Sequence, residues 1–320
     1  MTNLLLLLAL PEKVRVQYYD RLREKFPEVS ITLVDHHSKT DRHIASADIL
    51  MTFGPMLGDS ADEVIARATN LKWIQAVGTG VDNIADLPSL GKEVVVTNIR
   101  GIQGAPVSEA ALMAMLALCR DLPRVVRNQD RHEWQRWPTS LLDGKTVGIF
   151  GVGTIAEELA PKCKAMGMTV VGITSAKREV AGFDRMVDRQ ELVGAVAQLD
   201  HLVLLTPYSP QTKGIVDAEV FGAMKSSAFL INLGRGGVVD EAALLHALQT
   251  GQIAGAALDV FATEPLPAEH PFWAMENVLI TPHLGGFCDV YAERALPVIE
   301  ENLRRFLAGN LEGLTNIVER

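Results

Sequence analysis

Short apolar runs alternate with amphipathic segments through the first hundred residues of the chain. Each run is flanked by polar or turn-forming residues, as buried strands are, and helical segments such as Ala61–Ala68 lie between the runs. The predicted strands are Leu4–Leu10, Ile31–Val34, Ile49–Thr52, Trp73–Ala76 and Val94–Thr97. Because strands that alternate with helices form parallel sheets, this part of the chain predicts a doubly wound α/β domain.

A second series of apolar runs follows a long apolar helix, expected from Ala105 to about Arg120, and a polar stretch from Asp121 to Leu142. The strands predicted in this series are Val147–Phe150, Thr169–Ile173, His201–Leu205, Ala228–Asn232, Gly255–Asp259 and Val278–Ile280. A last helix near Val290–Leu307 carries apolar residues at helical spacing on one face. The whole pattern predicts an α/β protein with two doubly wound parallel-sheet domains.

One strand of the second series ends in a glycine-rich turn, Gly151-Val152-Gly153-Thr154-Ile155-Ala156, which leads into a helical segment from Glu157 to Met166. Gly151 permits a tight turn, Gly153 lets the backbone approach a pyrophosphate, and Ala156 is small enough for the helix to pack on the sheet. Backbone N–H groups at the start of the helix favour phosphate. We interpret the turn as a dinucleotide site with contacts at Gly151, Gly153, Thr154 and Ile155; a purely structural glycine turn is the alternative.

The end of the next strand bears on which dinucleotide is bound. An NAD-binding fold places an acidic residue there for the ribose hydroxyls, whereas this chain has Thr174, followed by Ser175, Lys177 and Arg178. Hydroxyls and two cations accept a 2′-phosphate that a carboxylate would repel. The sequence therefore favours NADP(H) over NAD(H), and the alternative is that the two cations are ordinary solvated loop charges.

Composition limits the classes of function. A length of 320 residues suits two domains, and a net charge of −9 argues against nucleic-acid or anionic-membrane partners. No basic segment precedes the apolar run at Leu4–Leu10, which predicts a buried strand and not a targeting segment. Three distant cysteines without metal spacing indicate reduced thiols of a cytoplasmic protein. His36, His37 and His43 lack supporting ligands, so no metal site is expected.

Three residues that suit proton and hydride chemistry each follow a predicted strand of the second series. They are Arg235, Glu264 and His283. The carboxyl ends of parallel strands meet at one edge of a sheet, so a cation, a carboxylate and an imidazole are predicted to converge there. A guanidinium binds an anionic 2-keto acid, an imidazolium protonates its carbonyl oxygen, and a carboxylate orients the imidazole and raises its pKa.

The segments around these residues resemble the D-isomer-specific 2-hydroxyacid dehydrogenases. The resemblance rests on Ile231–Asp240, Ala257–Pro265 and Thr281–Gly286, and it extends from about Val77 through the last helix. It implies a flavodoxin-like substrate-binding domain, residues 1–99 with 290–320, and a Rossmann cofactor domain, residues 100–289, with a dimerisation segment at about 105–142.

The same resemblance implies roles for individual residues. Arg235 binds the substrate carboxylate and carbonyl, His283 is the acid/base, and Glu264 is the partner of His283. Asp259 meets the nicotinamide carboxamide, and Thr206 and Pro207 line the cofactor. Backbone N–H groups at Val77, Gly78, Thr79 and Gly80 hold the substrate carboxylate, as a glycine turn allows.

The sequence thus predicts a homodimeric reductase of small 2-keto acids of the glyoxylate or hydroxypyruvate type. A formate dehydrogenase is not expected, because that branch carries Gln at the Glu264 position, nor is a long phosphoglycerate dehydrogenase, because nothing follows Arg320 to form a regulatory domain. The alternative from another class is a non-enzymatic, corepressor-like dinucleotide sensor on the same fold.

Overall fold

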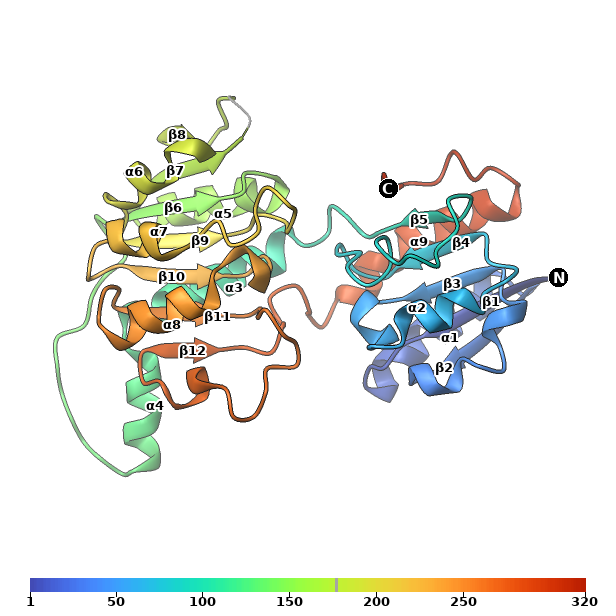
Figure 1. Ribbon diagram of the computed structural model, residues 1–320, viewed down its shortest axis with the longest axis horizontal. Helices are drawn as coiled ribbons and strands as arrows, with labels where there is room; N and C mark the ends of the chain where they lie inside the picture. The colour runs from blue at the N-terminus through green and yellow to red at the C-terminus, as the bar shows by residue number, and fades with distance from the viewer. Residues whose placement is uncertain (176–177) are drawn as a thin grey trace. The chain divides into compact units, whose positions relative to one another are not determined.

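The chain forms two compact units in a computed structural model that describes residues 1–175 and 178–320. The first unit joins Met1–Ile102 to Asp289–Arg320, and the second is Gln103–Cys288. Figure 1 follows the chain through both units from blue to red. Within the described ranges, no helix has both the length and the apolar character needed to cross a bilayer.

The first unit is a five-stranded parallel sheet with helices on both faces. Its elements are β1 (Thr2–Leu7), α1 (Glu12–Lys25), β2 (Val29–Val34), β3 (Ile49–Thr52), α2 (Ala61–Ala66), β4 (Trp73–Ala76), β5 (Val95–Thr97) and α9 (Tyr291–Leu307). The strand order β2-β1-β3-β4-β5 is the order of flavodoxin-like folds.

Each face of this sheet is covered by different helices. Leu5 and Leu7 of β1 share an apolar cluster with Val64 and Ile65 of α2. On α9, which comes from the far end of the sequence, the Phe306 ring stacks on Trp73 of β4 with ring centroids 5.5 Å apart. Strands buried on both faces are expected to be apolar throughout, which is why these strands could be recognised in the sequence.

The second unit is a seven-stranded parallel sheet. Its strands are β6 (Thr146–Phe150), β7 (Thr169–Thr174), β8 (Arg185–Asp188), β9 (His201–Leu204), β10 (Phe229–Asn232), β11 (Gly255–Leu258) and β12 (Val278–Ile280). Its helices are α3 (Gly104–Cys119), α4 (Leu122–Asp130), α5 (Thr154–Ala165), α6 (Leu192–Val196), α7 (Ala218–Ala223) and α8 (Glu241–Gln249). The strand order is β12-β11-β10-β9-β6-β7-β8. The strands β7 and β8 lie on one side of β6, and the strands from β9 onward lie on its other side, so the order changes direction between β6 and β9, as in a Rossmann fold.

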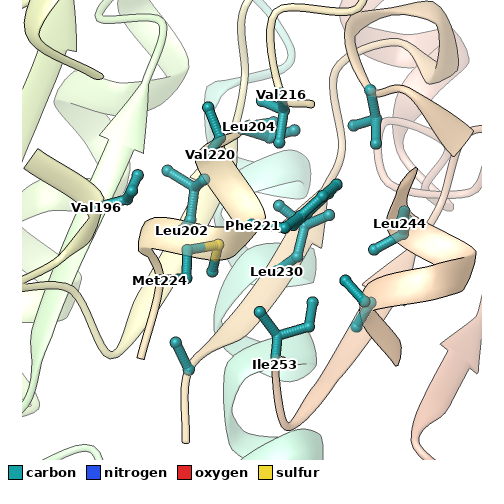
Figure 2. Packing of buried hydrophobic residues seen from close by; sticks show 14 of the residues in the cluster. Val196, Leu202, Leu204, Val216, Val220, Phe221, Met224, Leu230, Leu244 and Ile253 are labelled. Carbon is teal, nitrogen blue, oxygen red and sulfur yellow. The ribbon is translucent and has the colours of Figure 1, made fainter. Parts of the chain in front are cut away.

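Side-chain alternation along the central strands builds two cores. Leu202 and Leu204 of β9 pack with α6, α7 and α8, whereas Val203 between them packs with α3 and α5. Figure 2 shows the first of these cores, where Phe221 of α7 lies between Leu230 of β10 and Leu244 of α8. The two parallel sheets, of five and seven strands, confirm the predicted α/β fold.

The strand β8 and the helix α4 are among the elements of the second unit that the sequence did not predict. β8 is a short edge strand, Arg185–Asp188, and α4 lies inside the polar stretch from Asp121 to Leu142, for which no element was predicted. Neither buries a continuous apolar run, so neither carries the periodic signal on which the prediction depended.

Candidate active site

The glycine-rich turn after β6 is built as a phosphate-binding turn requires. Gly151 has φ of 99°, and a Cβ there would lie 2.5 Å from the Thr206 nitrogen, so only glycine fits. A Cβ on Gly153 would meet no described atom within 4 Å, which leaves the backbone open to a ligand. The first hydrogen bond of α5 runs from the Glu157 N–H to the Gly153 carbonyl oxygen, so the amides before Glu157 point out of the helix start.

The predicted ribose-binding segment begins at the end of β7. Thr174 is the last residue of the strand, and Ser175 follows it with an exposed side chain. Arg178 turns back onto the glycine-rich turn, where it donates to the Val152 carbonyl oxygen at 3.1 Å and to Glu157 Oε1 at 2.9 Å. Lys177 lies outside the described residues.

The segment after β9 packs directly on the same turn. Thr206 is buried, and its backbone closes off the side-chain position of Gly151. The carbonyl oxygen of Pro207 accepts a hydrogen bond from Thr212 Oγ1 at 2.8 Å, which fixes the loop. Thr206 therefore contributes backbone to the surroundings of the turn, whereas the Pro207 carbonyl oxygen is bound within its own loop.

Arg235 stands on a turn that a buried asparagine holds after β10. The Asn232 side chain accepts the Gly234 N–H at 3.1 Å and donates to the Arg235 carbonyl oxygen at 3.1 Å. The Arg235 guanidinium donates to the Gly234 carbonyl oxygen at 2.7 Å. The sequence pattern gave no role to Asn232, although an asparagine at the end of a buried strand, two residues before a glycine, is a residue type that stabilises turns through its side chain.

Glu264 and His283 form a close pair, as the sequence predicted for neighbouring strand ends. His283 Nδ1 lies 2.7 Å from Glu264 Oε2, and Glu264 Oε1 accepts the Phe261 N–H at 3.0 Å. A carboxylate beside Nδ1 holds the proton on that nitrogen, so Nε2 of the imidazole is left for a substrate. The His283 side chain is 46% exposed, so it remains accessible to one.

The contact between His283 and Glu264 raises the pKa of the imidazole and lowers the pKa of the carboxyl group. The hydrogen bond to Glu264 raises the pKa of His283 against the opposing effect of burial. Burial tends to raise the pKa of Glu264, but hydrogen bonds from His283 and from the Phe261 N–H bring it below its ordinary value. The positive charge of Arg235 acts on both groups by lowering both pKa values, so the three residues share one electrostatic environment.

The turn that carries His283 is fixed by Asp259, which follows β11. Asp259 is buried, and its carboxylate accepts from Thr281 Oγ1 at 2.5 Å and from the N–H groups of Leu284 and Gly285 at 2.8 and 2.9 Å. Its carbonyl oxygen accepts the His283 N–H at 2.9 Å. These bonds hold His283 at φ of 53°, a backbone conformation that non-glycine residues adopt only when their surroundings enforce it.

The predicted substrate loop at 77–80 belongs to the first unit. The Val77 carbonyl oxygen accepts from Tyr291 Oη at 2.8 Å, and Gly78 O accepts the Ile99 N–H at 2.9 Å. Thr79 Oγ1 donates to the Ile99 carbonyl oxygen at 2.8 Å, while Gly80 follows without regular secondary structure. The loop is thus anchored through carbonyl and hydroxyl groups and also through the Val77 N–H, which donates to the Thr52 carbonyl oxygen at 2.8 Å. This amide is therefore engaged within the first unit, and of the four predicted N–H groups the Val77 amide does not fit a contact to the substrate carboxylate.

Comparison with protein families identifies a match over the second unit of the chain. Residues 112–285 match the family described as D-isomer specific 2-hydroxyacid dehydrogenase, NAD binding domain. A D-3-phosphoglycerate dehydrogenase of Methanocaldococcus jannaschii is 34% identical over 262 residues, which are 80% of this chain and 49% of that protein. The chain spans about half the length of the curated relatives it matches.

Solved structures match over nearly the whole chain. A D-isomer specific 2-hydroxyacid dehydrogenase family protein from Aeromonas salmonicida is 33% identical with a TM-score of 0.87, and the match covers 99% of both chains. An NADPH-dependent glyoxylate/hydroxypyruvate reductase from Sinorhizobium meliloti, solved with NADP and sulfate, is 29% identical with a TM-score of 0.83. That match covers 100% of this chain and 98% of the reductase.

Proposed function

This chain belongs to the D-isomer specific 2-hydroxyacid dehydrogenase family, and we propose that it reduces a small 2-keto acid to the D-2-hydroxy acid with a nicotinamide dinucleotide. The observation that carries the proposal is the His283–Glu264 pair at 2.7 Å beside the charge of Arg235. A proton donor and a fixed cation are the groups that reduction of an anionic carbonyl compound requires.

Each residue has one task in this reaction. Arg235 binds the substrate carboxylate and polarises the carbonyl through its planar guanidinium. His283 gives the proton on Nε2 to the carbonyl oxygen, and Glu264 stabilises the imidazolium through Nδ1. The bound cofactor supplies the hydride. Asp259 holds the turn that carries His283, and its predicted contact to the nicotinamide carboxamide remains a prediction.

The residues around the glycine-rich turn fit a dinucleotide. Open space at Gly153 and the exposed amides at the start of α5 suit a pyrophosphate. We propose that the dinucleotide is NADP(H), bound at its 2′-phosphate by Ser175, Lys177 and Arg178 with Thr174 in place of an acidic residue. The contact of the Arg178 guanidinium with the Val152 carbonyl oxygen of the glycine-rich turn supports this choice, as does the NADP bound by the Sinorhizobium meliloti relative.

We propose glyoxylate or hydroxypyruvate as the substrate, with the N–H groups of Gly78, Thr79 and Gly80 binding the carboxylate. The relative from Sinorhizobium meliloti is named for these two keto acids. The similarity to D-3-phosphoglycerate dehydrogenases favours a second candidate, the phosphorylated form of hydroxypyruvate. All three share the 2-keto acid group that Arg235 and His283 recognise.

We propose that the protein is a homodimer that pairs through α3, α4 and the following segment. Leu122, Val125 and Val126 form an exposed apolar face on α4, and the Trp134 side chain is 93% exposed. The opposite face of α4 is bound to its own unit, because Arg127 donates to the carbonyl oxygens of Met275 and Glu276. An apolar helix face that points away from its own core is typical of a protein interface.

An assay of the three keto acids with NADPH and with NADH tests the proposed activity. We expect turnover of at least one keto acid, with lower KM for NADPH than for NADH. His283→Ala should lower kcat by about 10²–10⁴ while cofactor binding changes little. Folded wild-type protein without turnover of any of them would favour the dinucleotide sensor, and tighter binding of NADH would contradict the cofactor assignment.

A further inference from the structure

A second carboxylate binds the segment that carries Glu264. Glu241 lies in the first turn of α8, and its Oε2 accepts the Ala262 N–H at 3.2 Å. The preceding amide, Phe261 N–H, is the one that donates to Glu264 Oε1. Two adjacent amides are thus held by two different carboxylates. One carboxylate is that of Glu264, which belongs to the proposed proton-donating pair, and the other is that of Glu241 on α8.

A histidine fixes the second carboxylate in turn. His270 Nε2 lies 3.2 Å from Glu241 Oε1, and His270 Nδ1 accepts the Phe272 N–H at 3.3 Å. Because Nδ1 accepts a hydrogen bond, it carries no proton, so Nε2 carries the proton and donates it to Glu241. Both oxygens of Glu241 are therefore engaged, and they join α8 to the segment at Phe261–Ala262 and to His270.

The same segment is packed tightly against the turn of Arg235. A Cβ on Gly236 would lie 1.9 Å from the Phe261 carbonyl carbon, so the two backbones are in direct contact. A shift at Phe261–Ala262 would consequently displace Glu264 and press on the residue next to Arg235. This segment therefore contacts both the Glu264 carboxylate and the backbone next to Arg235.

We propose that Glu241 is a positioning residue of the active site. Glu241 holds the Ala262 amide and thereby the position of Glu264, and Glu264 in turn affects the protonation of His283. His270 keeps the Glu241 carboxylate in place. The inference rests on the proposed function only where it concerns turnover, since the ionisation of His283 can be followed without substrate.

Two substitutions of Glu241 separate its geometry from its charge. Glu241→Asp keeps the charge but is too short to reach both Ala262 N–H and His270 Nε2. Glu241→Gln keeps the length but offers one acceptor where two donors point at it, so one contact is lost. Glu219→Gln is the matched control, because Glu219 occupies the first turn of α7 in the same unit.

We expect NMR titration of the His283 ring to show the same change in both Glu241 variants. The midpoint should fall toward 6.5, with an increase of about threefold in the acid dissociation constant, because Glu264 no longer holds its best position. In turnover assays kcat should fall by about three- to tenfold with the KM for keto acid within about twofold. Glu219→Gln should leave the titration unchanged.

An unchanged His283 titration in both variants would overturn the proposal, and so would a change in Glu241→Gln alone, which would indicate an effect of charge only. Hydrogen exchange in the wild-type protein gives a test that needs no variant. The Ala262 amide should be protected although Ala262 itself is exposed, and exchange at the rate of an unstructured amide would refute the contact. Activity retained in His283→Ala would instead count against the proposed function, because the titration does not depend on turnover.

Discussion

At the scale of single residues, the site depends on one imidazole whose proton is held in place by a carboxylate. His283 has a raised pKa because Glu264 stabilises its charged form, so the imidazolium persists above pH 6.5. In the proposed reaction, reduction uses this proton, so kcat/KM for reduction should be highest below the raised pKa. It should fall roughly tenfold per pH unit above that pKa. Oxidation of the hydroxy acid needs the neutral imidazole and should show the opposite dependence.

Replacing Glu264 tests this relation. Glu264→Gln removes the charge that raises the pKa of His283, so the falling limb of the reduction profile should move to lower pH. The measurement is kcat/KM for reduction between about pH 5.5 and 9.5 in both proteins, with circular dichroism as the check on folding. Profiles with the same midpoint would show that Glu264 does not set the ionisation that limits the reaction.

The positions of the three candidate catalytic residues could be predicted from the sequence, but the contacts of Asp259 and Glu241 that hold them could not. Arg235, Glu264 and His283 were predictable because each follows a buried strand, and the carboxyl ends of parallel strands share one edge. The contacts that fix them were not, because Asp259 and Glu241 act through backbone amides of irregular loops. No periodic pattern records which amide a carboxylate will meet.

At the scale of elements, burial decided what could be predicted. The interior strands β3 and β4 have the predicted bounds, because every residue of both strands is buried and most of those residues are apolar. The edge strand β8 and the helix α4 were missed, since β8 is short and α4 directs its apolar face outward. Elements whose partners are water or another chain leave a weaker signal in the sequence than elements of the core.

The helices α1 and α9 are joined by a buried ion pair whose contribution to stability can be measured. Glu300 of α9 has a side chain that is 4% exposed, and it accepts from Arg21 Nε at 2.8 Å and from Lys25 Nζ at 2.6 Å on α1. Burial opposes the charged form of Glu300, but these two cations keep its pKa below the ordinary value. The carboxylate therefore joins the C-terminal helix to the start of the chain within the first unit.

Glu300→Gln should destabilise the first unit by about 1–3 kcal/mol, because a buried charged hydrogen bond to each cation is lost. Urea unfolding followed by the fluorescence of Trp73 in β4 would measure it. The neighbouring Glu301→Gln is the control, since Glu301 forms exposed pairs with Arg304 and Arg305, so its replacement should leave the stability nearly unchanged. The difference should be complete above pH 4.5 and disappear as pH falls through the lowered pKa of Glu300. Equal losses of unfolding free energy in the two variants would mean that the buried contacts of Glu300 stabilise the unit no more than the exposed pairs of Glu301 do.

At the scale of the whole molecule, the exposed apolar side chains are not scattered evenly. A group of them lies on α3, on α4 and in the segment that follows: Met113, Leu116, Leu122, Val125, Val126, Trp134 and Leu141. Single exposed apolar residues are ordinary, but a gathering of this size on neighbouring elements is the kind of surface that the proposed homodimer would cover. The net charge of −9 gives two copies no long-range attraction, so the association would depend on this apolar surface.

The mass in solution tests this dependence. Wild-type protein should have a mass of twice 34.8 kDa by light scattering, and Val126→Lys should shift it toward a single chain, because a desolvated ammonium in the interface is costly. Met166→Lys is the matched control, since Met166 is also exposed in the second unit but lies at the end of α5, where a cation is favourable. The side chain of Val126 is 47% exposed in the chain alone, so this substitution should leave the unit folded while it breaks the dimer. A wild-type mass of one chain, or a dimer that tolerates Val126→Lys, would show that α4 faces water and not a second copy.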